Sequence, residues 1–162
     1  MPASQRLSFL GLAFDTLDAH TAAAAMAQRA RSGGRLAYVA TPNVDHMVRL
    51  NSQPELKPLY DGAWLTLCDS RILELFARAS RLALPCAPGA DIVELLFLGH
   101  IRPADTVLVV GGSKAQSERL RADFGLKDLR WFDAPRDLRN DAAARAVCID
   151  FIRRNPAHYV FL

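Results

Sequence analysis

The sequence predicts an α/β fold of the Rossmann-like kind, a largely parallel sheet with helices on both faces. Two observations predict it. Short apolar segments rich in β-branched residues alternate with amphipathic segments of helical length. The apolar segment at residues 106–110 also runs directly into Gly111-Gly112-Ser113 and another amphipathic stretch, which is the order of a βα unit. A chain of 162 residues, 51% hydrophobic and 23% charged, can bury one core, so we predict a single domain over residues 1–162.

Several segments have the apolar, β-branched character of strands and are bounded by residues that favour turns. The expected strands are residues 7–14, 36–40, 64–68, 106–110, 129–132 and 159–162. A parallel strand in such a series normally leads into another loop at the functional edge of the sheet. A chain that stops on its last strand therefore either ends its domain in an unusual way or is shorter than the protein from which it derives.

Amphipathic segments of helical length lie between these strands. Thr16 is the expected cap of the first helix and Gly33-Gly34 its end, while Gly125 should end the helix that follows Ser113. His46, in the first turn of the helix after Asn43, could cap that helix or pack against it. The other expected helical segments are a short turn after Pro54 and helices at residues 72–79, from Ala90 and at 141–155.

The composition excludes several classes of protein. Arginines scattered along a chain with a formal charge of +3 form no stripe for nucleic acid, although they allow modest attraction to phosphorylated ligands or anionic headgroups. No apolar stretch approaches the roughly 20 residues of a membrane span, and no signal peptide is evident, so we expect a cytoplasmic protein. Three widely spaced cysteines suit reduced thiols rather than a disulfide framework or a zinc site, and no Asp-x-Asp is present to hold a divalent metal.

Polar residues follow two of the expected strands, where parallel sheets gather their ligands. Thr41-Pro42-Asn43 presents a hydroxyl and an amide around a proline that fixes the turn, although Asn43 or Thr41 could merely cap the next helix. Asp69 ends the strand at 64–68, so its carboxylate could cap the helix that follows or act as a general base. The two roles are compatible, because a cap uses only one carboxylate oxygen.

A third loop suits a nucleotide. Gly111-Gly112-Ser113 lets backbone amides at a helix N-terminus approach a phosphate or a ribose, although the same sequence also suits a tight βα turn. Asp133 lies 22 residues beyond Gly111 at the end of the next strand, from which an acid can reach a ribose hydroxyl. This pairing keeps an NAD-type Rossmann oxidoreductase open as an alternative.

Four motifs, taken in order and spacing, resemble the WecG/TagA/CpsF glycosyltransferases over nearly the whole chain. They are Thr41-Pro42-Asn43-Val44-Asp45, Cys68-Asp69-Ser70, Pro88-Gly89-Ala90-Asp91 and Val109-Val110-Gly111-Gly112. The resemblance implies an inverting transfer of a hexose or N-acetylhexosamine from a UDP-sugar to a polyprenyl-diphosphate-linked saccharide, in bacterial surface polysaccharide synthesis, with no metal or other cofactor. It implies that Asp69 is the catalytic base, that Thr41, Asn43, Gly89 and Asp91 bind substrate, and that Gly111 and Gly112 bind the nucleotide. From the loop pattern described above, we expect Ser113 and Asp133 to bind the nucleotide with them.

The sequence also departs from the family pattern. Ser70 replaces a glycine, Cys86-Ala87 stands where an arginine is common, and Asp133-Ala134-Pro135-Arg136 replaces a glycine-aromatic loop. The family continues past the last strand into a further loop and a basic segment that approaches the membrane. The resemblance therefore implies a truncated member that binds UDP better than it turns over, with peripheral membrane contact in the full-length form. A non-catalytic nucleotide-binding remnant stays open as an alternative, and so does a homo-oligomer.

Overall fold

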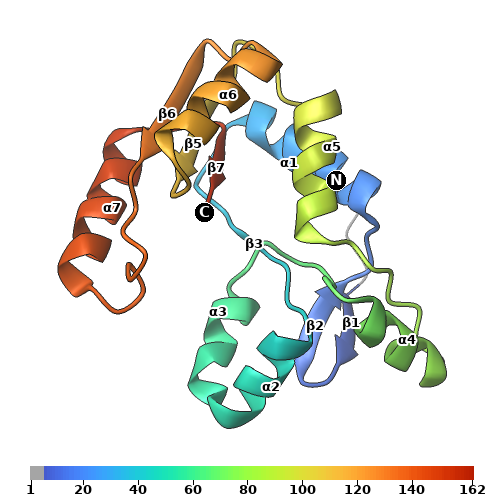
Figure 1. Cartoon of the computed structure of the whole chain (residues 1–162). Coiled ribbons are helices and arrows are strands. Elements are labelled where there is room, and N and C mark those ends of the chain that lie inside the picture. The colour runs from blue at the N-terminus through green and yellow to red at the C-terminus, as the bar shows by residue number, and fades with distance from the viewer. Residues whose placement is uncertain (1–5) are drawn as a thin grey trace. The chain divides into compact units, whose positions relative to one another are not determined.

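The computed structural model describes residues 6–162. The chain forms two compact units, Met1–His100 and Ile101–Leu162 (Figure 1). We call them the N-terminal unit and the C-terminal unit. Both combine helices with parallel strands, so the predicted α/β fold is confirmed. The prediction that residues 1–162 form a single domain stays a prediction. Within residues 6–162, no helix has both the length and the apolar character needed to cross a membrane.

The N-terminal unit begins with an antiparallel hairpin, β1 (Arg6–Phe9) and β2 (Leu12–Asp15). The prediction of one strand over residues 7–14 is therefore wrong. Leu10 and Gly11 form the turn with φ values of 48° and 82°, the two successive positive values that suit a tight hairpin. Glycine accepts a positive φ readily, but leucine seldom takes one. In the sequence, therefore, only Gly11 pointed to a turn.

Helix α1 (Ala19–Ser32) starts two residues later than the sequence indicated. Asp18, not Thr16, is its cap, since the Asp18 carboxylate accepts the Thr21 N–H at 2.7 Å. The cap prediction for Thr16 is therefore wrong. The predicted end is confirmed, because Gly33 closes the helix at a φ of 67°.

Three extended segments lie in parallel beyond this helix. Strand β3 (Val39–Ala40) pairs with β4 (Leu65–Thr66), and Cys68 forms a further parallel bridge with Cys86. The strand predicted at residues 36–40 is shorter than expected, since Leu36 is 77% exposed. Its early residues lack the burial that a central strand needs.

Helices α2 (Val44–Ser52), α3 (Lys57–Asp61), α4 (Arg71–Ala79) and α5 (Gly89–Gly99), with the 3-10 turn η1 (Pro54–Leu56), complete the N-terminal unit near their predicted positions. A buried cluster of residues from the hairpin, from α4 and from the segments next to this helix forms a core: Phe9, Leu12, Phe14, Cys68, Leu73, Ala77 and Leu84. The buried Asp15 carboxylate joins the hairpin to β4 by accepting the Thr66 N–H at 2.8 Å.

The C-terminal unit is a βαβαβ fold. It contains β5 (Thr106–Val110), α6 (Lys114–Phe124), β6 (Asp128–Phe132), α7 (Ala142–Arg154) and β7 (Tyr159–Phe161), which confirms the predicted elements. All strands are parallel, in the order β6-β5-β7. Because the second crossover reverses the direction of the first, right-handed connections would place α6 and α7 on opposite faces of the sheet.

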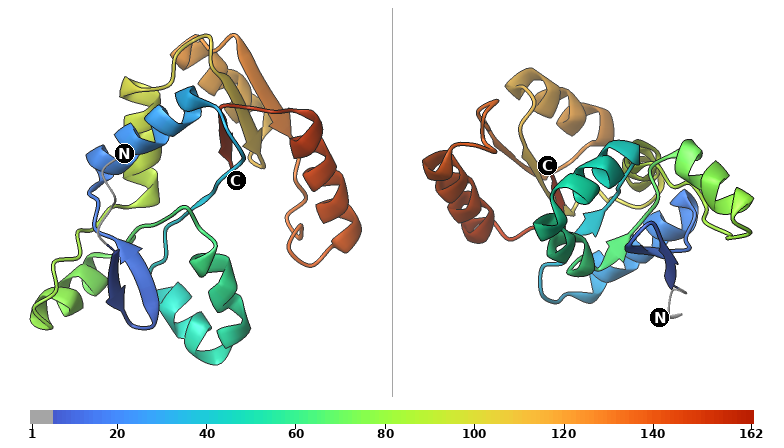
Figure 2. Two further views of the ribbon diagram at one scale, coloured as in Figure 1. Left: turned by 180° about the vertical axis from the view of Figure 1, so that it is seen from behind. Right: turned by 90° about the horizontal axis from the view of Figure 1, so that it is seen from below.

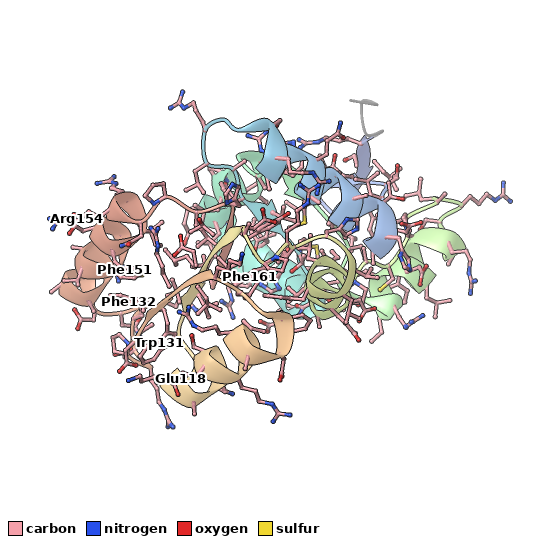
Figure 3. The ribbon with its side chains drawn as sticks, turned by 90° about the horizontal axis from the view of Figure 1, so that it is seen from above. Glu118, Trp131, Phe132, Phe151, Arg154 and Phe161 are labelled. Carbon is pink, nitrogen blue, oxygen red and sulfur yellow. The ribbon has the colours of Figure 1, made fainter. Side chains whose placement is uncertain are left out.

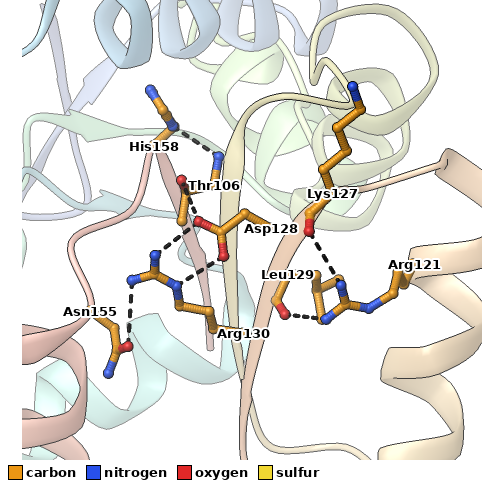
Figure 4. A network of polar contacts seen from close by, with 8 residues as sticks. All are labelled: Thr106, Arg121, Lys127, Asp128, Leu129, Arg130, Asn155 and His158. Atoms are coloured by element: carbon orange, nitrogen blue, oxygen red, sulfur yellow. Dashed lines mark hydrogen bonds and ion pairs between the residues drawn. The ribbon is translucent and has the colours of Figure 1, made fainter.

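A polar network fixes the amino-terminal edge of this sheet (Figure 4). The Asp128 carboxylate accepts the Thr106 hydroxyl at 2.9 Å and the Arg130 guanidinium at 2.8 Å, while the Thr106 N–H donates to His158 Nδ1 at 2.9 Å. The hydrogen bonds from Arg130 and from the Thr106 hydroxyl hold the pKa of Asp128 below its usual value. Phe132 of β6 and Phe151 of α7 pack with ring centroids 5.1 Å apart (Figure 3). The opposite, carboxyl-terminal edge is the one that carries the glycine loop.

Candidate functional site

Asp69 directly follows the parallel segment that contains β4. Its backbone N–H donates to the Pro42 carbonyl at 3.0 Å, and the Leu67 N–H donates to Ala40 at 2.8 Å. The pairing of β3 and β4 thus continues beyond the strands themselves. The two loops that the sequence singled out, after Ala40 and after Cys68, consequently lie side by side.

The Asp69 side chain does not cap the helix that follows it. Ser70 caps α4, because its hydroxyl accepts the Leu73 N–H at 3.2 Å. The Asp69 carboxylate instead accepts the Gly89 N–H at 3.3 Å through Oδ2. Gly89 is the first residue of α5, so Asp69 satisfies one of the backbone donors that a helix start leaves unpaired.

Gly89 also lies against Thr41. A β-carbon placed on Gly89 would lie 3.1 Å from Thr41 Oγ1 and 3.7 Å from Asp69 Oδ2, so only glycine allows this approach without displacing a neighbour. Thr41, Asp69 and Gly89 therefore form one group, which we call the Asp69 cluster. Among the residues that the structure describes, Asp69 Oδ1 has no hydrogen-bond partner, which leaves that oxygen available to a substrate.

Asn43 is the cap of α2. Its side-chain oxygen accepts the His46 N–H at 3.3 Å, and the His46 ring nitrogen Nδ1 lies 3.3 Å from the Asn43 N–H and 2.8 Å from that oxygen. A single tautomer of His46 makes one of these last two bonds, since Nδ1 either accepts or donates. The capping alternative for Asn43 is thus realised, and His46 takes part in the cap.

A hollow of about 500 Å³ lies between the start of α1 and one side of α5. The two helices pack side by side in the views of Figures 1 and 2. Asp91 lines this hollow, whereas the group that contacts Asp69 is Gly89, two residues earlier. The lining residues are Asp18, Ala19, His20, Cys86, Asp91, Glu94, Leu95 and Leu98. Sequence reasoning selected only Asp91 from this set.

The charge on Asp18 at the rim of the hollow is stabilised by the helix that it caps. Its hydrogen bond with Thr21 holds the pKa of the Asp18 carboxyl below its usual value. Cys86 behaves in the opposite way, because burial raises the pKa of its thiol. The hollow thus presents carboxylates beside a protonated thiol.

All three cysteines are free, as predicted. Burial raises the pKa of Cys68 to about 11, and burial also raises the pKa of Cys148. Because the thiolate is the nucleophilic form, none of the three suits covalent catalysis near neutral pH.

The glycine loop of the C-terminal unit has the backbone that its sequence indicated. Gly111 and Gly112 have φ values of 90° and 68°, which favour glycine. Ser113 caps α6 in a capping box with Gln116. The Gly111 N–H donates to the Phe132 carbonyl at 2.9 Å, and the Ser113 N–H donates to Gln116 Oε1 at 2.8 Å. Two amides of the loop are therefore engaged within the protein, as in a tight βα turn.

Asp133 is exposed and follows β6 at the same edge of the sheet. Its neighbour Ala134 lies 4.0 Å from the position of a β-carbon on Gly111. The Trp131 indole N–H donates to the Gly111 carbonyl at 2.8 Å and so ties the loop to β6. Sequence reasoning missed Trp131, because an indole in a strand is usually a core residue.

Residues 6–162 contain no group of three or more histidine, cysteine, aspartate or glutamate side chains placed to hold a metal ion. In a comparison with known protein families, the sequence matches the family described as 'Glycosyl transferase WecG/TagA/CpsF family'. The match covers residues 7–162, nearly the whole chain. No curated protein matches the sequence significantly.

Proposed function

Since the chain belongs to the WecG/TagA/CpsF family of glycosyl transferases, which act in cell-surface polysaccharide synthesis, we propose that Asp69 is the base of its transfer reaction. The family establishes a transferase with a nucleotide-sugar donor and a sugar acceptor. The proposal is an inverting, metal-independent transfer of a hexose or N-acetylhexosamine from a UDP-sugar to a polyprenyl-diphosphate-linked saccharide. The observation that carries it is the Asp69 carboxylate, held by the Gly89 N–H beside Thr41.

The two oxygens of Asp69 have different tasks in this mechanism. Oδ2 is held at the start of α5, where the helix dipole favours a negative charge, and this bond fixes the plane of the carboxylate. Oδ1 removes the proton of the acceptor hydroxyl as the hydroxyl oxygen attacks the anomeric carbon. The bond from that carbon to UDP breaks on the opposite face, which inverts the configuration. Thr41 and Asn43 lie in the adjoining loop and would orient hydroxyl groups of the substrate.

The nucleotide is assigned to the glycine loop of the C-terminal unit. The strand order β6-β5-β7 places the reversal of the sheet between β5 and β7, and parallel sheets bind ligands at the carboxyl ends of strands beside such a reversal. Gly112 and the first turn of α6 would supply amide donors to the diphosphate, and Asp133 would accept a ribose hydroxyl. The charge that develops on UDP would be met by these dipoles.

The test measures transfer and binding separately. Asp69→Asn keeps a side-chain oxygen for the Gly89 N–H but removes the base, so transfer from a radiolabelled UDP-sugar should fall by about 10²–10⁴-fold. Calorimetry should show unchanged UDP binding. Asp61→Asn is the matched control, because Asp61 is a surface acid paired with Lys57. Equal activity of Asp69→Asn and the parent protein would refute the role of Asp69.

Two alternatives make different predictions in the same experiments. An NAD-type oxidoreductase built on Gly111 and Asp133 would bind NAD in preference to UDP. A non-catalytic nucleotide-binding remnant would bind UDP but transfer no sugar, in the parent protein as in the variant. Addition of a metal chelator tests the remaining part of the proposal, since metal-independent transfer should continue at the same rate.

A further inference from the structure

Helix α4 carries an exposed apolar surface on the side away from the core. Ile72, Leu75 and Phe76 are 56%, 52% and 56% exposed, which is unusual for three large apolar side chains on one helix. Their spacing of three and four residues places them on one face of the helix. We call these three residues the α4 face.

Core contacts on the opposite side of the helix keep the α4 face turned toward solvent. Leu73 and Ala77 are buried in the core of the N-terminal unit, and Ser70 caps the first turn. Glu74, the only acid of the helix, turns toward the protein, where its Oε1 accepts the Cys86 N–H at 3.4 Å. The helix therefore cannot rotate to bury the α4 face without breaking its own core contacts.

Three exposed arginines accompany the apolar residues: Arg71, Arg78 and Arg81. Arg71 and Arg78 are seven residues apart, so they lie two turns from one another along one border of the α4 face. Among the described residues, none of these arginines forms an ion pair with a carboxylate. The surface thus combines apolar side chains with unneutralised positive charge.

We propose that the α4 face docks on the surface of an anionic lipid bilayer, with Ile72, Leu75 and Phe76 at the boundary of the acyl chains and the arginines among the headgroups. An apolar face bordered by cations is the combination that an anionic interface binds. A soluble protein partner with an apolar groove would need acidic residues at its rim to match it, whereas anionic headgroups supply the complementary charge at once. Docking here rests on the proposed function, since a polyprenyl-linked acceptor is anchored in a membrane.

The test measures binding to vesicles in the absence of any substrate. The full chain should sediment with vesicles of phosphatidylcholine and phosphatidylglycerol, and poorly with phosphatidylcholine alone. Leu75→Gln with Phe76→Gln should weaken the binding by about tenfold or more, because the apolar burial is lost. Arg71→Gln with Arg78→Gln should weaken it by about tenfold, and added salt should mimic that effect. Glutamine keeps the helix propensity, and the substituted residues are exposed.

Control variants lie on the exposed face of another helix. Val147→Gln and Arg153→Gln change one apolar and one basic residue of α7, and neither should alter vesicle binding. Unchanged vesicle binding of the α4 variants would overturn the proposal. So would a concentration-dependent dimer in sedimentation velocity that the α4 variants abolish, because the face would then be an interface between two copies.

Transfer to a water-soluble acceptor separates this proposal from the proposed function. Variants of the α4 face should keep that transfer and lose only transfer to a vesicle-bound acceptor. If the parent protein binds vesicles but transfers no sugar, the docking proposal stands while the proposed function fails. If it transfers sugar to the soluble acceptor without binding vesicles, the docking proposal fails alone.

Discussion

The Asp69 carboxylate and the Gly89 N–H are joined by a hydrogen bond of 3.3 Å that links the end of a parallel strand segment to the first residue of a helix. The candidate base is therefore oriented by the backbone of α5 and not by another side chain. A substitution at Gly89 can consequently disturb the base without touching its chemistry.

Gly89→Ala should lower sugar transfer by about tenfold while leaving the fold intact. The new methyl group would lie 3.1 Å from Thr41 Oγ1, so the Thr41 hydroxyl or the start of α5 must shift, and a small shift beside a reacting group is costly to the rate. Gly89 has no positive φ, so alanine introduces no backbone strain. Transfer kinetics and thermal unfolding should be measured together.

Gly99→Ala is the matched control for that substitution. Gly99 ends the same helix, also without a positive φ, and a β-carbon there would meet nothing within 4 Å. Alanine should raise the free energy of unfolding by about 0.4–1 kcal/mol and leave transfer unchanged. Equal losses of activity in both variants would show that α5 as a whole, rather than the Asp69 cluster, is sensitive.

Gly112→Ala should weaken UDP binding in addition to destabilising the C-terminal unit. The positive φ of 68° alone costs an alanine about 1–2 kcal/mol, and its methyl group would lie 3.2 Å from Gln116 Oε1, the acceptor of the Ser113 N–H. Gly125→Ala has a similar φ of 61° in open space and therefore reports the strain without the displacement. Calorimetry with UDP should separate the two variants, and equal affinities would argue against the glycine loop as the nucleotide site.

Asp18 should contribute stability that depends on pH. Its pKa is lowered in the folded protein, so its contribution is fully present above the unfolded value near 3.8 and is lost as the pH falls through the folded value. Asp18→Ala should lower the free energy of unfolding by about 1 kcal/mol at neutral pH, because α1 loses its cap. Asp18→Asn keeps a neutral cap.

Chemical denaturation at several pH values tests this assignment. The advantage of the parent protein over Asp18→Ala should shrink below about pH 4, whereas that of Asp18→Asn over Asp18→Ala should stay constant. If the parent protein and Asp18→Asn respond to acid in the same way, another carboxyl group is responsible.

The C-terminal unit could be predicted almost completely from sequence, because its signals are local. Residues 106–110 form an apolar run of strand length, Gly111 and Gly112 mark the turn, and Gly125 adopts the left-handed conformation that ends α6. Each signal lies within a few residues of the feature that it specifies. Tertiary contacts were therefore not needed to predict these elements.

The N-terminal unit was harder to predict because tertiary contacts decide its short elements. Leu10 takes a positive φ that its side chain disfavours, and the hairpin that results is held by the burial of Phe9, Leu12 and Phe14. β3 is only two residues long and is defined by its pairing with β4. No pattern in the sequence encodes either contact.

The candidate site likewise has one part that could be predicted from the sequence and one part that could not. The proximity of the loops at Thr41 and Asp69 could be predicted, because the ends of neighbouring parallel strands meet at one edge. The hollow beside Asp91 could not, since it depends on how α1 packs against α5. The same packing brings Asp18 and Cys86, 68 residues apart in the sequence, into one lining.

Cys86 should be the first of the three cysteines to react with iodoacetamide in the native protein. It is partly exposed in the lining of the hollow, whereas Cys148 is 5% exposed and Cys68 is fully buried with a pKa raised to about 11. Peptide mass spectrometry should therefore find Cys86 modified first at about pH 8, at a rate that rises with pH as the thiolate forms. If Asp91 binds the donor, a UDP-sugar should slow the modification of Cys86 by occupying the hollow. Modification of Cys68 at the same rate would show instead that the core opens, and an undiminished rate at Cys86 under saturating donor would place the sugar away from Asp91.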